Sequence, residues 1–249
     1  MVKIATFNLH LGLDRWLQRR SLVVSELLEL EADVIALQEI ALPIQQGVWL
    51  RNQLNARSDK PPYQLAQRRR RSLLNWYEGV GFLTRLPVVA ADALALSFGR
   101  IAVRLNLDLP SGETVDVVSI HLHSRPDAHE TREKQVMAVM GWLDGRGGAR
   151  KRIVAGSLRA EPGSLAVERM KIFFGYQSAY AAVHGREPLA TFPTALKQHK
   201  TPVGVIHDYI FVSPHIPVKE AGLFGLRSAE DDDTLYPSDH IGILAELNL

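Results

Sequence analysis

Short runs in which apolar and polar residues alternate recur along most of this chain, a pattern typical of β-strands with one buried face. The first run, Val2 to Phe7, stops at the polar residue Asn8. A second apolar run, Asp33 to Gln38, stops at Glu39. We therefore expect two early strands that each deliver an oxygen-bearing side chain where the strand ends.

Similar runs predict strands in the rest of the chain, with a turn at Pro110-Ser111-Gly112 inside a central meander. The predicted strands are Ala93 to Leu96, Arg100 to Leu107, Thr114 to Ile120, Arg152 to Gly156, Asp208 to Ser213 and Ile241 to Leu247.

Two segments have the apolar spacing of helices instead. Arg15 to Leu30 is one, and Asp127 to Leu143 is the other, which we expect to be closed by Gly145 and Gly147-Gly148. Many strands with short turns, interrupted by two or three helices, predict an α+β sandwich with helices on the outside of two sheets.

The composition is that of an ordinary globular protein, with 46% hydrophobic and 22% charged residues among 249. We see no linker, so residues 1–249 are expected to form one domain. The absence of cysteine excludes disulfides, thiolate zinc sites and a cysteine nucleophile. Any metal must therefore be held by oxygen or imidazole.

The charge pattern excludes few classes of binding partner. The net charge is +2, and the four arginines at positions 68–71 fit a solvated loop better than a phosphate-steering patch. The chain enters its first strand without a basic and apolar leader, and no apolar run is long enough to span a bilayer. We expect a cytoplasmic protein with no membrane partner.

Polar side chains that can do chemistry gather at predicted strand ends. Glu39, with Asn8 beside it, could bind Mg²⁺ through oxygen, although a surface acid is the simpler interpretation of Glu39 alone. His121 and His240 could move protons or contact phosphate, with Glu78 and Asp208 as their respective orienting partners. We interpret the remaining histidines as structural: His10, His123, His129, His184, His199, His207 and His215.

The order of these features resembles the endonuclease/exonuclease/phosphatase superfamily. The resemblance spans nearly the whole chain and rests on the strand ending at Asn8, "DVIALQEI" with Glu39, "GVGFLTR", "SIHLHS" with His121, "TFPT", "HDYIFVSP" with Asp208, and "SDHIGI" with Asp239-His240. It implies a four-layer αββα sandwich of two mainly antiparallel sheets and cleavage of phosphoesters with Mg²⁺ or Mn²⁺.

The same resemblance implies roles for individual residues. The metal would be held by Glu39 with Asn8 and Asp239, and Asn8 would also contact the phosphate. His121, Asp208, Asp239 and His240 would be the catalytic residues. The expected partner is a phosphoester substrate, which a nucleic acid could supply, bound by a monomer.

One motif departs from the family pattern, Gly-Asp-x-Asn, because this chain has Gly156-Ser157-Leu158-Arg159. A serine cannot replace a carboxylate as base or anionic ligand, whereas Arg159 could bind a phosphate through two hydrogen bonds. Glu161 could take over the acidic role only from a displaced position. We therefore predict a metal-dependent phosphoester hydrolase impaired at Ser157 and Arg159. The alternative is a pseudoenzyme that binds a phosphate ester or nucleic acid without cleaving it.

Overall fold

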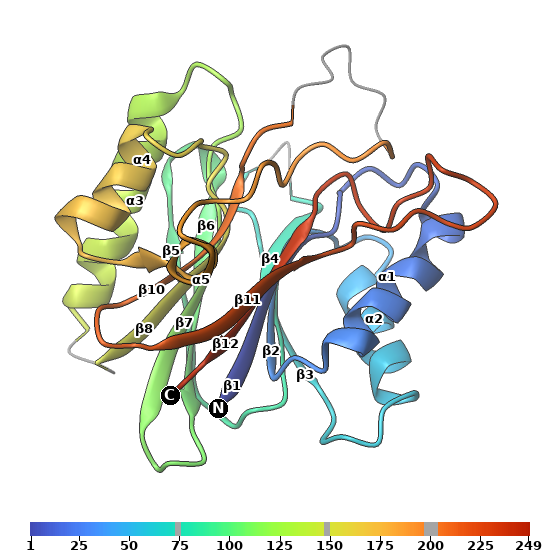
Figure 1. The fold of residues 1–249 in the computed structure, drawn as a ribbon, viewed down its shortest axis with the longest axis horizontal. Coiled ribbons are helices and arrows are strands. Elements are labelled where there is room, and N and C mark those ends of the chain that lie inside the picture. The colour runs from blue at the N-terminus through green and yellow to red at the C-terminus, as the bar shows by residue number, and fades with distance from the viewer. Residues whose placement is uncertain (73–75, 147–149, 197–203) are drawn as a thin grey trace.

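The computed structural model describes residues 1–72, 76–146, 150–196 and 204–249, and in this part of the chain two six-stranded β-sheets pack face to face. Helices cover the outer face of each sheet (Figure 1). The predicted α+β fold with four layers is thus confirmed. Each sheet is mainly antiparallel and contains a single parallel pair among the described strands.

The first sheet has the order β11-β12-β1-β2-β4-β3. Its strands are β1 (Val2–Asn8), β2 (Val34–Ala41), β3 (Gln64–Arg69), β4 (Glu78–Thr84), β11 (Val218–Phe224) and β12 (Gly242–Leu247). The second sheet has the order β5-β6-β7-β8-β10-β9. Its strands are β5 (Val88–Ala95), β6 (Ile101–Asp108), β7 (Thr114–His121), β8 (Lys151–Ser157), β9 (Gln177–Ser178) and β10 (Asp208–Val212).

The helices divide between the two outer faces. The helices α1 (Trp16–Leu30) and α2 (Gln46–Asn55) lie on the first sheet. The second sheet is covered by α3 (His129–Asp144), α4 (Leu165–Glu168) and a π-helical turn (Arg169–Phe173). The short helix α5 (Ala179–His184) contacts β10 and β11, and a 3₁₀ turn (Ser97–Gly99) joins β5 to β6. In the described part of the chain, no helix is long and apolar enough to cross a membrane.

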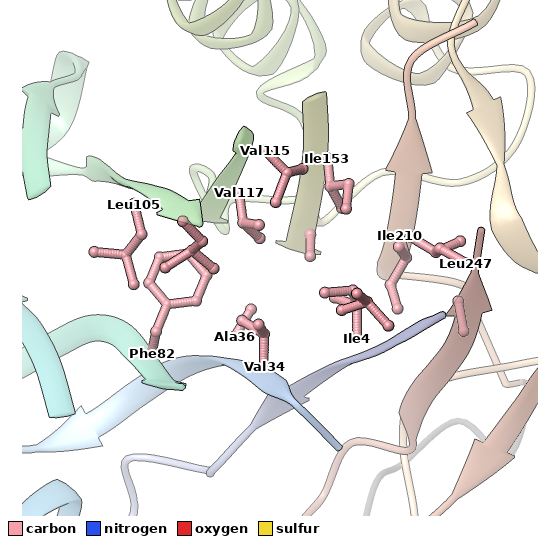
Figure 2. Close-up of a cluster of buried hydrophobic side chains, with 14 of the residues drawn as sticks. Ile4, Val34, Ala36, Phe82, Leu105, Val115, Val117, Ile153, Ile210 and Leu247 are labelled. Atoms are coloured by element: carbon pink, nitrogen blue, oxygen red, sulfur yellow. The ribbon is translucent and has the colours of Figure 1, made fainter. Parts of the chain in front are cut away.

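The core between the sheets is built from inward-facing side chains of strands in both sheets (Figure 2). Ile4 and Phe82 from the first sheet meet Leu105, Val117 and Ile210 from the second, and each of these side chains is at most 1% exposed. Burying one such side chain contributes about 1.5–3 kcal/mol, so this layer is the main source of stability.

Two parallel pairs determine where the polar strand ends meet. In the first sheet Asn8 on β1 lies opposite Gln38 on β2, next to Glu39. In the second, His121 on β7 lies opposite Ser157 on β8. The carboxyl ends of parallel strands share one edge within each sheet. Both pairs lie at the same end of the sandwich, since His121 Nε2 is 3.5 Å from Glu39 Oε1.

The close pairing of β7 with β8 depends on Gly156. A β-carbon at this position would come within 2.1 Å of the Ile120 carbonyl oxygen, and the backbone has φ +136°. A side chain at position 156 would therefore push the two strands apart just before His121 and Ser157.

Most predicted elements lie within a few residues of the observed ones, and the differences have local causes. Strand β5 begins at Val88, earlier than predicted, and most of its residues are exposed. The predictions missed β4, whose residues are all buried and therefore show no alternation. They also missed α2, β3, β11 and the elements between 165 and 184 because these segments are short or lie at sheet edges with few buried apolar residues. Helix α3 is followed by Gly145 as expected, whereas Gly147-Gly148 lies outside the described residues.

Candidate functional site

A bulge in β2 aims Glu39 into the site. The strand continues to Ala41, and its register with β4 shifts between Leu37 and Ile40. Glu39 has φ +54°, a conformation that residues other than glycine seldom adopt. Glu39 therefore lies within the strand rather than after its end, which corrects the sequence prediction.

Both carboxylate oxygens of Glu39 already accept hydrogen bonds from the protein. Oε2 accepts from the Leu11 backbone N–H at 2.9 Å, and Oε1 accepts from Asn8 Nδ2 at 3.1 Å. The other end of the Asn8 amide, Oδ1, accepts from the His10 backbone N–H at 3.0 Å. Asn8 is thus confirmed beside Glu39, but it presents a donor rather than an oxygen to it.

Arg159 supplies the positive charge opposite Glu39. Its Nη2 donates to Glu39 Oε1 at 2.9 Å, and its Nε lies 3.5 Å from His121 Nε2. Nη1 lies 3.4 Å from Nδ1 of His207, and the guanidinium sits 5.5 Å from the centre of the Phe192 ring. Burial alone would raise the pKa of Glu39, but His121 and Arg159 hold that pKa well below its usual range.

His121 is held between two glutamates. Its Nδ1 lies 2.7 Å from Glu78 Oε1, and its Nε2 lies 3.5 Å from Glu39 Oε1. Burial and the nearby Arg100 lower the pKa of His121 to about 4, so the ring is neutral at pH 7. Nδ1 also lies 2.9 Å from Arg100 Nη1, so Glu78 and Arg100 together hold this edge of the ring. Nε2 faces Glu39 and Arg159.

Glu78 anchors this histidine with the help of two buried arginines. Arg70 Nη1 donates to Glu78 Oε2 at 2.6 Å, and Arg100 Nη1 donates to Oε1 at 3.1 Å. Burial would raise the pKa of Glu78, but His121 and the two arginines lower it to about 2. The expected contact between Glu78 and His121 is confirmed.

Asp208 and His240 form a second buried pair, also as expected. Asp208 Oδ2 lies 2.7 Å from His240 Nδ1, and the Asp208 backbone N–H donates to Thr191 Oγ1 at 3.1 Å. By register, Asp208 stands opposite Ser157 on β8. Within the described residues, Ser157 Oγ, Asp208 Oδ1 and His240 Nε2 are buried without a hydrogen-bond partner.

Asp239 is engaged by a histidine. His10 Nδ1 lies 3.1 Å from Asp239 Oδ2, and its Nε2 lies 2.9 Å from Asp14 Oδ1. Burial would lower the pKa of His10, yet Asp239 raises it above the ordinary value. The loop is fixed by Ser238 Oγ, which donates to the Asn8 carbonyl at 2.7 Å.

Two histidines that we interpreted as structural belong to this site. His10 pairs with Asp239, and His207 contacts Arg159. Their positions were the available signal, since His10 is two residues beyond Asn8 and His207 directly precedes Asp208. Of the others, His123 stacks on Phe98 at 4.4 Å, and His199 lies outside the described residues.

The family follows from a comparison with known proteins. The model of the Endonuclease/Exonuclease/phosphatase family matches residues 5–240. The chain belongs to this family.

Solved structures of the family share its fold over nearly the whole chain. A mannosyl-6-phosphatase from Bacteroides thetaiotaomicron is 18% identical, with 100% of each chain covered and a TM-score of 0.80. The human Nocturnin catalytic domain with bound sulfate is 20% identical, with 99% of this chain and 94% of that chain covered and a TM-score of 0.77. A family protein from Bacteroides vulgatus is 20% identical, with 100% and 98% covered and a TM-score of 0.78. A search of curated protein sequences found no match.

The donors observed here do not fit the divalent cation that the family implies. Across the described ranges, no group of three or more histidine, aspartate or glutamate side chains could hold a metal ion. Glu39 is paired with Arg159, Asp239 is paired with His10, and position 157 is an uncharged serine. The guanidinium of Arg159 supplies positive charge to the carboxylate that we expected to hold the metal.

This arrangement suits the binding of a tetrahedral anion better than the activation of water. Arg159 is a fixed cation at this site, and its planar guanidinium matches the oxygens of a phosphate. His240 is held by Asp208, and its buried Nε2 has no hydrogen-bond partner among the described residues. No carboxylate stands at position 157 to accept a proton from an attacking water.

Proposed function

We propose that this protein binds a phosphoester at the cluster of Glu39, His121, Arg159, Asp208 and His240, which we refer to as the pocket, and that its metal-dependent hydrolysis is suppressed. The ion pair between Arg159 and Glu39 at 2.9 Å carries this proposal. It supplies an internal cation next to the buried polar atoms of Ser157, Asp208 and His240. Buried polar atoms normally have partners, and phosphate oxygens would provide them.

The comparisons support the ligand class. Two proteins with the same fold are named as a mannosyl-6-phosphatase and as the Nocturnin catalytic domain with a bound sulfate anion. A phosphate ester and a sulfate both present tetrahedral oxygens with negative charge. A pocket with one arginine and two histidines is complementary to such a group.

Suppressed turnover follows from Ser157. The hydroxyl is fully buried and neutral, so it cannot take a proton from water near pH 7. Loss of a general base costs about 10²–10⁴-fold in rate. Binding does not depend on that base.

A second candidate is a metal-dependent phosphodiesterase, nuclease or phosphatase that acts by in-line water attack. It is favoured by the convergence of Asn8, Glu39, Asp239 and the Asp208–His240 pair at one end of the sandwich. For this candidate, Arg159 would have to leave Glu39 so that Glu39, Asn8 and Asp239 could hold Mg²⁺ or Mn²⁺.

Calorimetric titration with p-nitrophenyl phosphate separates the two candidates. We expect binding that is equal with Mg²⁺, with Mn²⁺ and with EDTA, and at least about tenfold weaker for Arg159→Met, because one charge-assisted pair is lost. The exposed residue Arg186 offers a matched control, Arg186→Met, which should bind as the wild type does. Metal-dependent turnover by the wild type that Glu39→Ala abolishes would overturn the proposal in favour of the second candidate.

Restoring the family motif tests the cause of the suppression. The double substitution Ser157→Asp with Arg159→Asn should raise metal-dependent hydrolysis of bis(p-nitrophenyl) phosphate by about tenfold or more. Ser157→Asp alone should not, since Arg159 still pairs with Glu39. If the double variant gains nothing, these two residues are not what limits turnover.

A further inference from the structure

A separate cleft opens at the edge of the sandwich where β3 and β5, the outermost strands on one side of each sheet, approach one another. It has a volume of about 780 Å³. One wall is formed by residues 68–72 with Trp76, and the other by Ala93, Leu94, Ala95 and Ile101. The four-arginine run that we predicted to be a solvated loop therefore lines a cavity.

In the arginine run 68–71, the third residue is buried and bonded to the protein, and the other three are exposed. Arg70 is buried and donates to Glu78 Oε2 at 2.6 Å and to the Phe98 carbonyl at 3.2 Å. Arg68, Arg69 and Arg71 are exposed, and none has a carboxylate partner among the residues that the structure describes. The anchor keeps these three uncompensated cations at the rim of the cleft.

Exposed aromatic rings stand beside these cations. Trp76 is 53% exposed and lines the cleft. Phe98 is 62% exposed and stacks on His123, and the Arg71 N–H donates to the neighbouring Gly99 carbonyl at 3.1 Å. Exposed rings next to a basic groove are the means by which proteins bind unpaired bases together with their phosphates.

The cleft and the pocket share one carboxylate. Arg70 bonds to Oε2 of Glu78, while His121 lies against Oε1 of the same group. A polymer with regularly spaced phosphates could therefore place one phosphate in the pocket and its neighbours along the arginines.

We propose that this cleft binds single-stranded nucleic acid, with Arg68, Arg69 and Arg71 on phosphates and Trp76 stacked on a base. The strand is single because a paired base has no free face for Trp76. This names the ligand class for the neighbouring pocket and rests on the proposed function only for the placement of one phosphate. Binding in the cleft itself does not require the pocket.

The test is fluorescence anisotropy with a labelled oligothymidylate in EDTA, as a function of salt. Arg69→Glu with Arg71→Glu should lower the affinity by about tenfold or more and flatten the logarithmic salt dependence by about 1.4, since each phosphate contact contributes about 0.7. Arg57→Glu with Arg186→Glu is the matched control of two exposed arginines elsewhere, and it should change the affinity by about twofold or less. Trp76→Ala should cost about tenfold without changing the salt slope.

Two results would overturn the proposal. One is an equal loss of affinity in the control pair, which would mean that net charge alone attracts the strand. The other is duplex DNA bound as tightly as the single strand with no loss on Trp76→Ala. Thermal unfolding of each variant must match the wild type for these comparisons.

The outcome is separable from the proposed function. Loss of oligonucleotide binding in the Arg69/Arg71 variant, with p-nitrophenyl phosphate still bound, supports the cleft and leaves the pocket intact. Oligonucleotide binding without any binding of p-nitrophenyl phosphate supports the cleft and overturns the proposed function of the pocket.

Discussion

Two glutamates flank His121, and they are surrounded very differently. Glu78 lies against Nδ1 and is matched by Arg70 and Arg100, with all of these side chains at most 8% exposed. Glu39 lies near Nε2 and is matched by one arginine, Arg159, at 13% and 16% side-chain exposure. The first cluster is closed to solvent, and the second borders the pocket.

This difference suggests different roles for the two clusters: the Glu78 cluster holds His121 in place, and the Glu39 cluster faces the proposed ligand. The Glu78 cluster fixes the ring of His121 through contacts at Nδ1. On the proposed function, the Glu39 cluster determines the charge that meets the ligand, because Arg159 supplies its cation.

The largest effect should come from removing the charge of the closed cluster. Glu78→Gln leaves Arg70 and Arg100 buried without a counter-charge, and breaking such a pair costs about 3–5 kcal/mol. The free energy of unfolding in urea measures this. The control is Glu113→Gln, which breaks an exposed pair with Lys151 and should leave stability unchanged. A loss for Glu78→Gln no greater than in the control would mean that the closed cluster does not support the fold.

The same cluster should make stability depend on acid. The pKa of Glu78 falls from 4.5 to about 2 on folding, so its stabilisation is complete above pH 4.5 and is lost as pH falls toward 2. The fall corresponds to about 3 kcal/mol between these limits. Between pH 4.5 and 2, the free energy of unfolding should therefore fall more steeply with pH for the wild type than for Glu78→Gln. Parallel pH profiles would contradict the lowered pKa of Glu78.

The residues that meet at the pocket could be predicted because the rules involved are local. Asn8, His121 and Asp208 stand where apolar alternation stops or starts, and parallel pairing brings such ends to one edge. Asp208 was also expected to orient His240, and the two are observed 2.7 Å apart. Strand ends are visible in a sequence even when their neighbours are not.

The remaining features depend on partners that sequence patterns do not show. In the sequence, Arg70 cannot be distinguished from the three arginines beside it. It is buried because it pairs with Glu78 on the neighbouring strand. The pair between Glu39 and Arg159 spans 120 positions. Because of this separation, the sequence predicted a phosphate-binding role for Arg159 but not its ion pair with Glu39, the expected metal ligand.

The smallest effect concerns the open cluster, and it decides whether Arg159 and Glu39 act as a unit. Both side chains are partly exposed, so a double-mutant cycle of Glu39→Gln and Arg159→Met should give a coupling of about 1–2 kcal/mol, between the values for surface and buried pairs. Each single substitution leaves one charge without its partner, whereas the double variant leaves none. Additive losses in urea unfolding would show that the pair is not coupled. Calorimetric titration with Mn²⁺ gives a second measurement. The Arg159→Met variant should bind the ion more tightly than the wild type, because its Glu39 carboxylate is no longer paired. The double variant should show no such gain.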